Sequence, residues 1–324
     1  MRVIIPAAGI GSRLRPHTHT IPKSLLHVAG KPILGHILDS VVPLRPEEIV
    51  IITGFLGEKV QEYVNEHYDI PARFVQQEDL LGLGYAVNMG LEGVPDCPVL
   101  IILGDTIVDA DIGKFTTAGE NVLGLMHVSD PQRFGIAEVK DAVVTELVEK
   151  PAEPKSDLAL IGLYFIQQSG VLKEHLEQLI SSGKRTKNEF QLTDALQLMI
   201  EGGVKFTSYP VDGWYDCGKR ETLIATNRHL LKKNPGGRKI EGSIIVEPSY
   251  IAPSAVIENS IIGPYVSVSD KAVVKNSIIK NSIVGFGAEV NDSLLSDSLI
   301  GHKAQVTGDY GTLNVGDSSE VGHF

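Results

Sequence analysis

The sequence has 324 residues, of which 43% are hydrophobic and 21% charged, and 29 Lys and Arg against 40 Asp and Glu give a net charge of -11. This acidic balance argues against a protein that binds nucleic acid or anionic lipid through a basic face, so a few local cations must hold any charged substrate. Two cysteines, Cys97 and Cys217, are too few for a disulfide framework. The chain has no apolar run of about 18 residues that could span a membrane. These features predict a cytoplasmic protein of two domains that binds neither nucleic acid nor membrane.

The first part of the chain alternates short apolar runs with segments whose apolar residues are spaced three or four apart. This alternation is typical of a doubly wound α/β domain with a mixed, mostly parallel sheet. Strands are expected at 3–5, 49–52, 73–75 and 99–103, with helices at 33–42, 57–67 and 85–91. Further strands, some of them antiparallel, are expected at 122–128, 135–139, 143–148 and 160–166, and helices at 170–181, 191–200 and 219–233.

A short phrase of Asn or Asp, Ser and two aliphatic residues recurs after residue 241, as at 259–262, 276–279 and 292–295. An aliphatic residue recurs every five or six positions, which predicts side chains that point inward from the flat sides of a triangular parallel β-helix. A β-sandwich is the alternative, but it needs longer strands that alternate apolar and polar residues. The predicted domains are therefore an α/β domain at 1–234 and a hexapeptide-repeat β-helix at 235–324.

The first expected strand leads into Gly9-Ile10-Gly11, and a Gly-x-Gly turn lets backbone N–H groups approach phosphate oxygens. Neither the Walker A triplet nor the complete Rossmann fingerprint follows it. Arg13 and Lys23 beside the turn favour a triphosphate site, and a solvated loop is the alternative. The sequence assigns no role to His17 and His19 in the same loop.

Two carboxylates stand where open α/β sheets bind their ligands. Asp105 follows the strand at 99–103, and Asp216 lies between an expected strand and the last helix. Each alone is more often a turn or cap residue, but two carboxylates beside a phosphate site suit Mg²⁺.

A third element ends a strand with Glu149-Lys150-Pro151. Strand geometry would point Glu149 and Lys150 to opposite faces unless the strand breaks, and Pro151 supplies such a break. Lys150 could then hold a second anion, with an exposed surface pair as the alternative.

Together these motifs resemble the sugar-1-phosphate nucleotidyltransferase family, near its glucose-1-phosphate thymidylyltransferases and uridylyltransferases. The likeness covers roughly residues 1–232, and the tail at 240–310 resembles the left-handed hexapeptide β-helix behind many such domains. The matching residues are Gly9 to Pro16 with Pro22-Lys23, Gln77, Gly82, Gly104-Asp105, Gly135, Glu149-Lys150-Pro151 and Trp214-x-Asp216-x-Gly218. Glu189 also matches a family segment, and Thr193-Asp194 after it could simply start a helix.

The resemblance implies transfer of a nucleoside monophosphate from dTTP or UTP to a sugar-1-phosphate, with glucose-1-phosphate expected, to give a nucleoside diphosphate sugar and pyrophosphate. It implies catalytic roles for Arg13, Lys23, Asp105, Lys150 and Asp216, with Mg²⁺ held by Asp105 and Asp216. Nucleotide binding would fall to Ala8, Gly9, Gly11, Arg13, Gln77 and Gly82, and sugar-phosphate binding to Gly135, Glu149, Lys150 and Gly162. Leu83 stands after Gly82 where relatives often carry Thr or Ala, so the base stays open between dTTP and UTP.

Two other functions remain open at this stage. Hexapeptide β-helices can house acyltransferases with a histidine base, for which His302 and His323 are the candidates, although His302 fits a turn residue better. A regulatory subunit is the other alternative, but it would be expected to lack some of the charged residues present here. The aliphatic sides and open end of the β-helix predict a homo-oligomer.

Overall fold

The computed structural model describes residues 1–236, 238–308 and 310–322. The chain forms two compact units, and each combines segments that are distant in sequence. Unit 1 comprises Met1–Gly9 and Ile37–Trp214, and unit 2 comprises Ile10–His36 and Tyr215–Phe324. Among the described residues, no helix is both long and apolar enough to cross a membrane.

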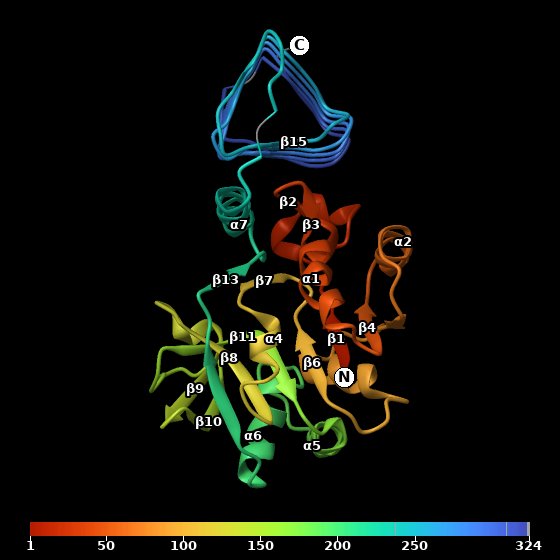
Figure 1. Cartoon of the computed structure of the whole chain (residues 1–324), viewed down its shortest axis with the longest axis vertical. Coiled ribbons are helices and arrows are strands. Elements are labelled where there is room, and N and C mark those ends of the chain that lie inside the picture. Colours follow the sequence, from red (N-terminus) through yellow and green to blue (C-terminus); the bar gives the residue numbers. More distant parts are fainter. Residues whose placement is uncertain (237, 309, 323–324) are drawn as a thin grey trace. The chain divides into compact units, whose positions relative to one another are not determined.

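Unit 1 is built on a nine-stranded sheet with the order β5-β4-β1-β6-β11-β8-β12-β10-β9 (Figure 1). The strands are β1 (Arg2–Pro6), β4 (Glu48–Thr53), β5 (Ala72–Gln76), β6 (Val99–Ile102), β8 (Asn121–His127), β9 (Gly135–Lys140), β10 (Val143–Glu149), β11 (Leu158–Ile166) and β12 (Phe206–Pro210). The pairings make β10 and β11 run opposite to the other strands. The prediction of a mixed, mostly parallel sheet with antiparallel additions is confirmed.

The helices of unit 1 cover this sheet. They are α2 (Gly57–His67), α3 (Leu83–Leu91), α4 (Ile112–Phe115), α5 (Ser169–Ser182) and α6 (Leu192–Glu201), while α1 (Ile33–Val41) begins in unit 2 and ends in unit 1. The aliphatic side chains of β1, β4 and β6 are buried, as the continuous apolar runs predicted, and α3, α5 and α6 pack into the same core. Burial on both faces explains why these strands carry aliphatic residues at successive positions.

Unit 2 contains the predicted β-helix, whose triangular coils are visible in Figure 1. Three five-stranded parallel sheets form its sides. The first has β14 (Ile244–Ile245), β17 (Ile261–Ile262), β20 (Ile278–Lys280), β23 (Leu294–Ser296) and β26 (Tyr310–Gly311). The second has β15 (Tyr250–Ile251), β18 (Ser267–Val268), β21 (Ile283–Val284), β24 (Leu299–Ile300) and β27 (Asn314–Val315). The third has β16 (Val256–Glu258), β19 (Val273–Lys275), β22 (Glu289–Asn291), β25 (Gln305–Thr307) and β28 (Glu320–Gly322).

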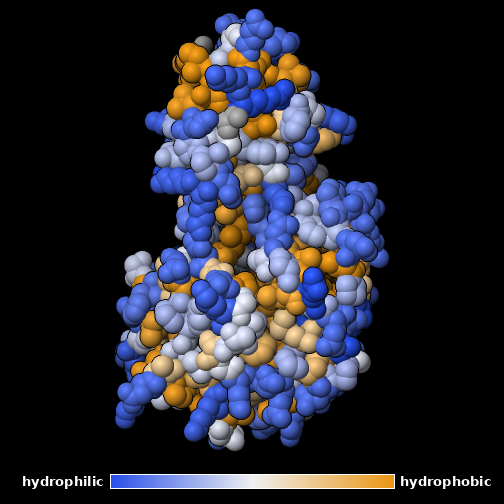
Figure 2. Space-filling model, viewed as in Figure 1, coloured by the Kyte–Doolittle hydropathy of each residue, from blue (hydrophilic) through white to orange (hydrophobic). Residues whose placement is uncertain are grey.

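The aliphatic residues predicted to point into the β-helix are buried, except for the partly buried Ile245 in the first coil. One outward row stays apolar as well. Ile244, Ile278 and Leu294 occupy matching positions of one side and are 60%, 44% and 47% exposed. Figure 2 shows apolar side chains at the surface of the β-helix.

The repeated Asn-Ser phrase has a clear structural cause. Asn276 adopts a left-handed backbone conformation with φ 49°, which Asn tolerates better than most residues. The buried Ser277 hydroxyl donates to Lys275 O at 2.7 Å and accepts the Ser293 N–H at 3.1 Å. The same two contacts recur at Ser260, Ser282 and Ser298. The repeated phrase in the sequence therefore marks a repeated turn of the coils.

The segment between residues 10 and 36 belongs to unit 2 together with α7 (Arg220–Lys233) and the β-helix. The Ala29 N–H donates to Asn227 Oδ1 at 2.8 Å, and a Cβ at Gly30 would lie 2.4 Å from a ring carbon of Tyr250. The division into domains at 1–234 and 235–324 stays a prediction. It concerns continuous stretches of sequence, whereas each compact unit joins two separate segments of the chain.

Several short elements escaped the sequence patterns. They are the strands β2 (His27–Val28), β3 (Lys31–Pro32) and β7 (Thr106–Asp109), the helix α4 and the 3₁₀ helices η1 (Ser12–Leu14), η2 (His17–His19), η3 (Lys23–Leu25), η4 (Val42–Leu44) and η5 (Pro131–Arg133). The strand expected before the last helix had no predicted bounds, and the structure has β12 and β13 (Gly213–Asp216) there. All of these elements, β12 and β13 included, span two to five residues. Such elements are too short to show a helical or strand period.

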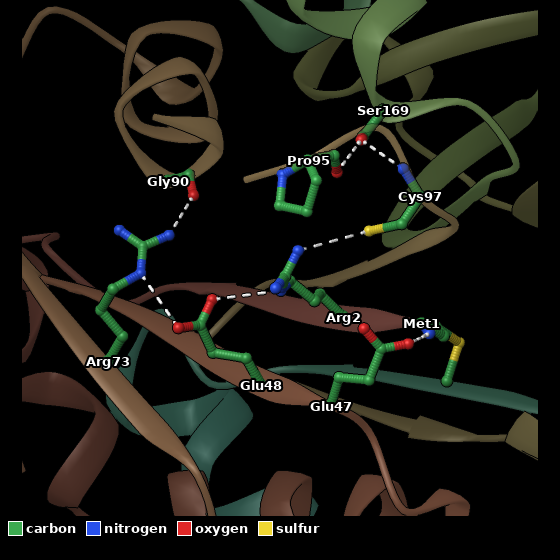
Figure 3. A network of polar contacts seen from close by, with 9 residues as sticks. All are labelled: Met1, Arg2, Glu47, Glu48, Arg73, Gly90, Pro95, Cys97 and Ser169. Carbon is green, nitrogen blue, oxygen red and sulfur yellow. Dashed lines mark hydrogen bonds and ion pairs between the residues drawn. The ribbon is translucent and has the colours of Figure 1, made fainter. Parts of the chain in front are cut away.

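Ion pairs link the amino ends of three parallel strands in unit 1 (Figure 3). Glu48 on β4 lies 3.4 Å from Arg2 Nε on β1 and 3.4 Å from Arg73 Nε on β5. Arg73 also donates to Gly90 O on α3 at 2.9 Å. The network therefore ties strands and helix together at the amino edge of the sheet, opposite the carboxyl edge where open α/β sheets bind ligands.

Candidate functional site

The carboxyl ends of β1, β4 and β6 converge on the start of the glycine-rich loop. A Cβ at Gly54, just after β4, would lie 2.5 Å from Ala8 O, and one at Gly104, after β6, would lie 2.7 Å from Ala7 Cβ. Glycine is therefore required at both positions. At Gly9 the reverse holds, since no described atom lies within 4 Å of where a Cβ would stand. The loop thus offers open space beside its backbone, as a phosphate-bearing ligand requires.

Gln77 follows β5 at the same edge of the sheet and is buried. Its backbone N–H donates to Thr53 O at 2.7 Å, and its Nε2 donates to Asp79 O at 3.0 Å. Because a carbonyl oxygen can only accept, the second bond fixes which way the carboxamide faces. The side-chain Oε1 is left as an acceptor.

Gly82 is placed by a close contact with the segment that precedes α6. Its φ of 114° favours glycine, and a Cβ would lie 2.6 Å from Phe190 O and 2.8 Å from Glu189 Cβ. The Gly84 N–H donates to the same Phe190 oxygen at 2.8 Å. Glu189, which matched the motif, is thus brought beside the predicted nucleotide-binding residue Gly82.

Two predicted sugar-phosphate residues, Gly135 and Glu149, face each other where β9 and β10 pair. The Thr193 hydroxyl donates to Glu149 Oε2 at 2.7 Å. A Cβ at Gly135 would lie 2.8 Å from Thr193 Oγ1 and 2.9 Å from Glu149 Oε2, so only glycine fits beside this pair. Burial raises the pKa of the nearby Tyr164 hydroxyl, and the negative charge of Glu149 raises it further. Glu149 is therefore a fixed acceptor, and Tyr164 stays protonated.

Lys150 lies beyond the predicted strand break. β10 ends at Glu149, and Lys150 has a left-handed backbone with φ 46°. This turn brings Lys150 Nζ within 3.1 Å of Glu149 Oε1, on the same side rather than on the opposite face. The Lys150 side chain is 38% exposed and that of Glu149 is 8% exposed. The ammonium is thus accessible to an anion while the carboxylate is held in place.

Gly162, the fourth predicted sugar-phosphate residue, lies inside β11. Its φ is 83°, and a Cβ would lie 2.6 Å from Leu103 Cδ1. The Leu103 N–H donates to Gly162 O at 3.0 Å. Gly162 therefore lets β11 approach the end of β6, next to the Gly104-Asp105 turn.

Unit 2 holds the remainder of the predicted phosphate loop. Gly11 has φ 68°, and a Cβ there would lie 2.9 Å from Thr18 Cγ2 and 3.1 Å from Lys23 Cβ. The Thr18 hydroxyl donates to Gly11 O at 2.8 Å. The structure thus brings Gly11 and Lys23 together, with Lys23 largely buried and Arg13 exposed on η1.

The two predicted metal ligands lie in different units, with Asp105 in unit 1 and Asp216 in unit 2. Both are partly buried. A Cβ at Gly218 would lie 2.7 Å from Asp216 Oδ1, so glycine keeps the space beside that carboxylate free. Among the described residues, no group of three or more His, Cys, Asp or Glu side chains could hold a metal ion. Each carboxylate by itself offers the oxygen ligands that Mg²⁺ takes, and Mg²⁺ keeps part of its shell for phosphate and water.

Two histidines in the tail were the candidate bases for an acyltransferase. His302 lies in a turn, as expected, and its backbone N–H donates to Asp317 Oδ1 at 2.8 Å. His323 lies outside the described residues.

Sequence reasoning missed Thr193 and Thr18 as supports of the site. The only sequence signal for Thr193 was that it lies close to Glu189 in the chain. A threonine near the start of a helix is more simply interpreted as a helix-capping residue.

The chain is similar to known proteins in sequence and in fold. A family model described as nucleotidyl transferase matches residues 2–233. The low-salt glycan biosynthesis nucleotidyltransferase Agl11 of Haloferax volcanii is 34% identical over 339 residues, covering 94% of this chain and 94% of that protein. The glucose-1-phosphate thymidylyltransferase of Streptomyces griseus is 29% identical over 337 residues, covering 95% of this chain and 94% of that protein. A solved UDP-glucose pyrophosphorylase with UDP-glucose shares the fold, with a TM-score of 0.63 and 24% identity over 72% of this chain and 98% of that chain.

Proposed function

Because this chain belongs to the nucleotidyl transferase family, we propose that it transfers a nucleoside monophosphate from UTP or dTTP to glucose-1-phosphate. A phosphate oxygen of the sugar phosphate attacks the α-phosphorus and forms a new P–O bond. The bond between the α-phosphorus and the oxygen bridging to the β-phosphate breaks, and pyrophosphate leaves. The sugar phosphate is already anionic, so no side-chain nucleophile is needed, and the barrier is mainly electrostatic and positional.

The observation that carries the choice of nucleotide is the fixed carboxamide of Gln77. Its Nε2 is engaged by Asp79 O, which leaves Oε1 as an acceptor. Uracil and thymine carry an N3–H donor that this oxygen can accept, whereas cytosine presents an acceptor at N3. The site therefore favours UTP or dTTP over CTP. The thymidylyltransferase name of the Streptomyces griseus relative supports the same class of base and also supports glucose-1-phosphate.

The sugar phosphate is assigned to the group of Gly135, Glu149, Lys150 and Gly162. Glu149 is oriented by Thr193 and can accept hydrogen bonds from sugar hydroxyls. Lys150 is exposed enough for its ammonium to pair with the phosphate. Gly135 leaves the space above Glu149 free of a side chain.

The triphosphate is assigned to the glycine-rich loop, where Ala8, Gly9 and Gly11 supply backbone and space. Arg13 and Lys23 would neutralise the β- and γ-phosphates. Mg²⁺ held by Asp105 and Asp216 would supply further positive charge at the transferring phosphoryl group. These cations reduce the repulsion between two polyanionic substrates.

The test is pyrophosphate release from a matrix of UTP, dTTP, CTP, ATP and GTP against glucose-, galactose-, mannose- and glucosamine-1-phosphate. We expect UTP or dTTP with glucose-1-phosphate to be fastest, with activity abolished by EDTA and restored by Mg²⁺. Lys150→Ala and Asp105→Asn should each lower turnover by about 10² to 10³. Release of pyrophosphate from none of the pairs would refute the proposal and favour a regulatory protein.

A further inference from the structure

One segment of the predicted phosphate loop lies against the last coil of the β-helix, within unit 2. His17 Nε2 lies 2.8 Å from Asn314 Oδ1, and Thr20 Oγ1 hydrogen-bonds Asp317 Oδ2. A Cβ at Gly316 would lie 2.8 Å from the ring of Pro16, so this turn of the coil is in close contact with the loop. We call residues 314–317 the supporting turn.

The contact is buried on the loop side. His17 and Thr18 are each only 2% exposed, although they lie in a short 3₁₀ helix. Asn314 presents an oxygen to His17, so the neutral ring donates from Nε2. A buried donor that loses its partner is costly, which makes this hydrogen bond specific.

The same segment sets the geometry of the glycine turn. The Thr18 hydroxyl donates to Gly11 O at 2.8 Å, and Gly11 leaves no room for a Cβ between Thr18 and Lys23. Residue 17 is thus fixed by the β-helix, and residue 18 fixes the turn. Asn314 is therefore connected to Gly11 by two side-chain hydrogen bonds, one from His17 to Asn314 and one from Thr18 to Gly11 O.

The loop needs such external support. From Ser12 to Leu25 its regular structure consists of three 3₁₀ helices of three residues each. Short 3₁₀ helices have poor hydrogen-bond geometry and little stability of their own. The contacts of the loop, rather than its local conformation, therefore determine its shape.

We propose that Asn314 and Asp317 are positioning residues that hold the phosphate loop in the shape that binds the nucleoside triphosphate. The inference rests on the proposed function, since it takes Gly11, Arg13 and Lys23 as the triphosphate site. Neither residue touches the substrates; each acts through His17 or Thr20. Without the supporting turn, the loop populates its binding shape for a smaller fraction of the time, and the apparent affinity falls by that fraction.

The test compares three variants of the full chain by steady-state kinetics. Asn314→Leu removes the acceptor, Asn314→Asp keeps an oxygen facing His17, and Arg228→Met is the control. Arg228 on α7 donates to Asn281 Oδ1 of the β-helix at 3.0 Å and therefore tests a unit 2 contact away from the loop.

We expect Asn314→Leu to raise the KM for the triphosphate by about tenfold while the KM for the sugar phosphate changes by less than about twofold. Asn314→Asp should restore the KM for the triphosphate to near the wild-type value, and Arg228→Met should leave it unchanged. Equilibrium binding of the triphosphate alone should report the same loss, and circular dichroism should show all variants folded.

A uniform loss of turnover with both KM values unchanged would contradict the inference, as would a triphosphate KM in Asn314→Leu equal to that of the wild type. An equal rise in Arg228→Met would point to general destabilisation and would also reject it. An inactive wild-type protein refutes the proposed function instead, and the two failures are therefore distinct.

Discussion

The hydroxyl of Thr193, in the first turn of α6, donates a 2.7 Å hydrogen bond to Glu149 Oε2 at the end of β10. This bond joins a helix to the strand that carries two predicted sugar-phosphate residues. It leaves Oε1 of Glu149 facing Lys150 Nζ at 3.1 Å. The carboxylate is thus held on both sides, and its orientation depends on a residue that touches neither substrate in the proposed arrangement.

We therefore predict that Thr193→Val raises the KM for the sugar phosphate by about tenfold, because Glu149 loses the donor that orients it. The KM for the triphosphate should stay near the wild-type value. Thr193→Ser retains the hydroxyl and serves as the matched control. Steady-state kinetics with each substrate varied in turn would measure both constants, and an equal effect of the two substitutions would contradict the assignment.

The fixed carboxamide of Gln77 leads to a prediction about base selection. UTP and dTTP should be preferred over CTP by at least about 10² in kcat/KM, since a site built to pair with an N–H rejects an analogue without it. Gln77→Leu should lower that ratio mainly through slower reaction of UTP and dTTP. Competition assays with mixed triphosphates, read by product chromatography, would measure the ratio. A ratio that the substitution leaves unchanged would remove Gln77 from base recognition.

The β-helix could be predicted from the sequence because its coils use the same residue types at equivalent turns and inward positions. Asn276 supplies a left-handed turn, and Ser277 bonds both its own coil and the next one. The parallel strands of unit 1 were equally clear, since burial on both faces leaves continuous apolar runs. In both cases the residues that are buried in the fold are the same residues that form the visible pattern in the sequence.

The placement of residues 10–36 with the β-helix could not be read in this way. The contact between His17 and Asn314 joins residues that are distant in sequence, and no period or motif marks either one. Thr193 was ambiguous for another reason, since the same side chain can start a helix or orient a carboxylate. Long-range hydrogen bonds between single polar residues leave no pattern in one sequence.

The serine positions of the β-helix allow a prediction about stability. Ser277→Ala would leave the Ser293 N–H without its 3.1 Å acceptor inside the coil. We expect a loss of about 1 to 2 kcal/mol, visible as a lower thermal unfolding midpoint. Lys280→Ala, at an exposed outward position of β20, the strand that follows Ser277, is the control and should change the midpoint little. Equal midpoints for the two variants would argue against the serine ladder.

His17 predicts a pH dependence of stability. Burial lowers its pKa, while the hydrogen bond to Asn314 and the charge of Asp317 act in the opposite direction. The folded protein therefore favours the neutral ring more than the unfolded chain does, where the pKa is about 6.5. The stabilising contribution is complete above that pH and is lost as the pH falls toward the lower pKa of the folded state.

The measurement is the thermal midpoint of the wild type and of His17→Gln between about pH 8 and pH 5. His27 and His302 line the same small cavity as His17 and Asp317, so only the difference between the two proteins isolates His17. We expect the wild type to lose more stability on acidification than the variant. Parallel curves for the two proteins would show that His17 does not titrate differently in the folded state.

The outward apolar row of the β-helix predicts its oligomeric state. Ile244, Ile278 and Leu294 align on one side, and a second copy of the chain offers the same flat row. Light scattering should give a mass of at least two chains, each of 35.0 kDa. The double substitution Ile278→Lys and Leu294→Lys should shift the measured mass toward that of the monomer. Val256→Lys, at an exposed position on another side of the β-helix, should leave the mass unchanged. A wild-type mass of 35.0 kDa at micromolar concentration would contradict the homo-oligomer.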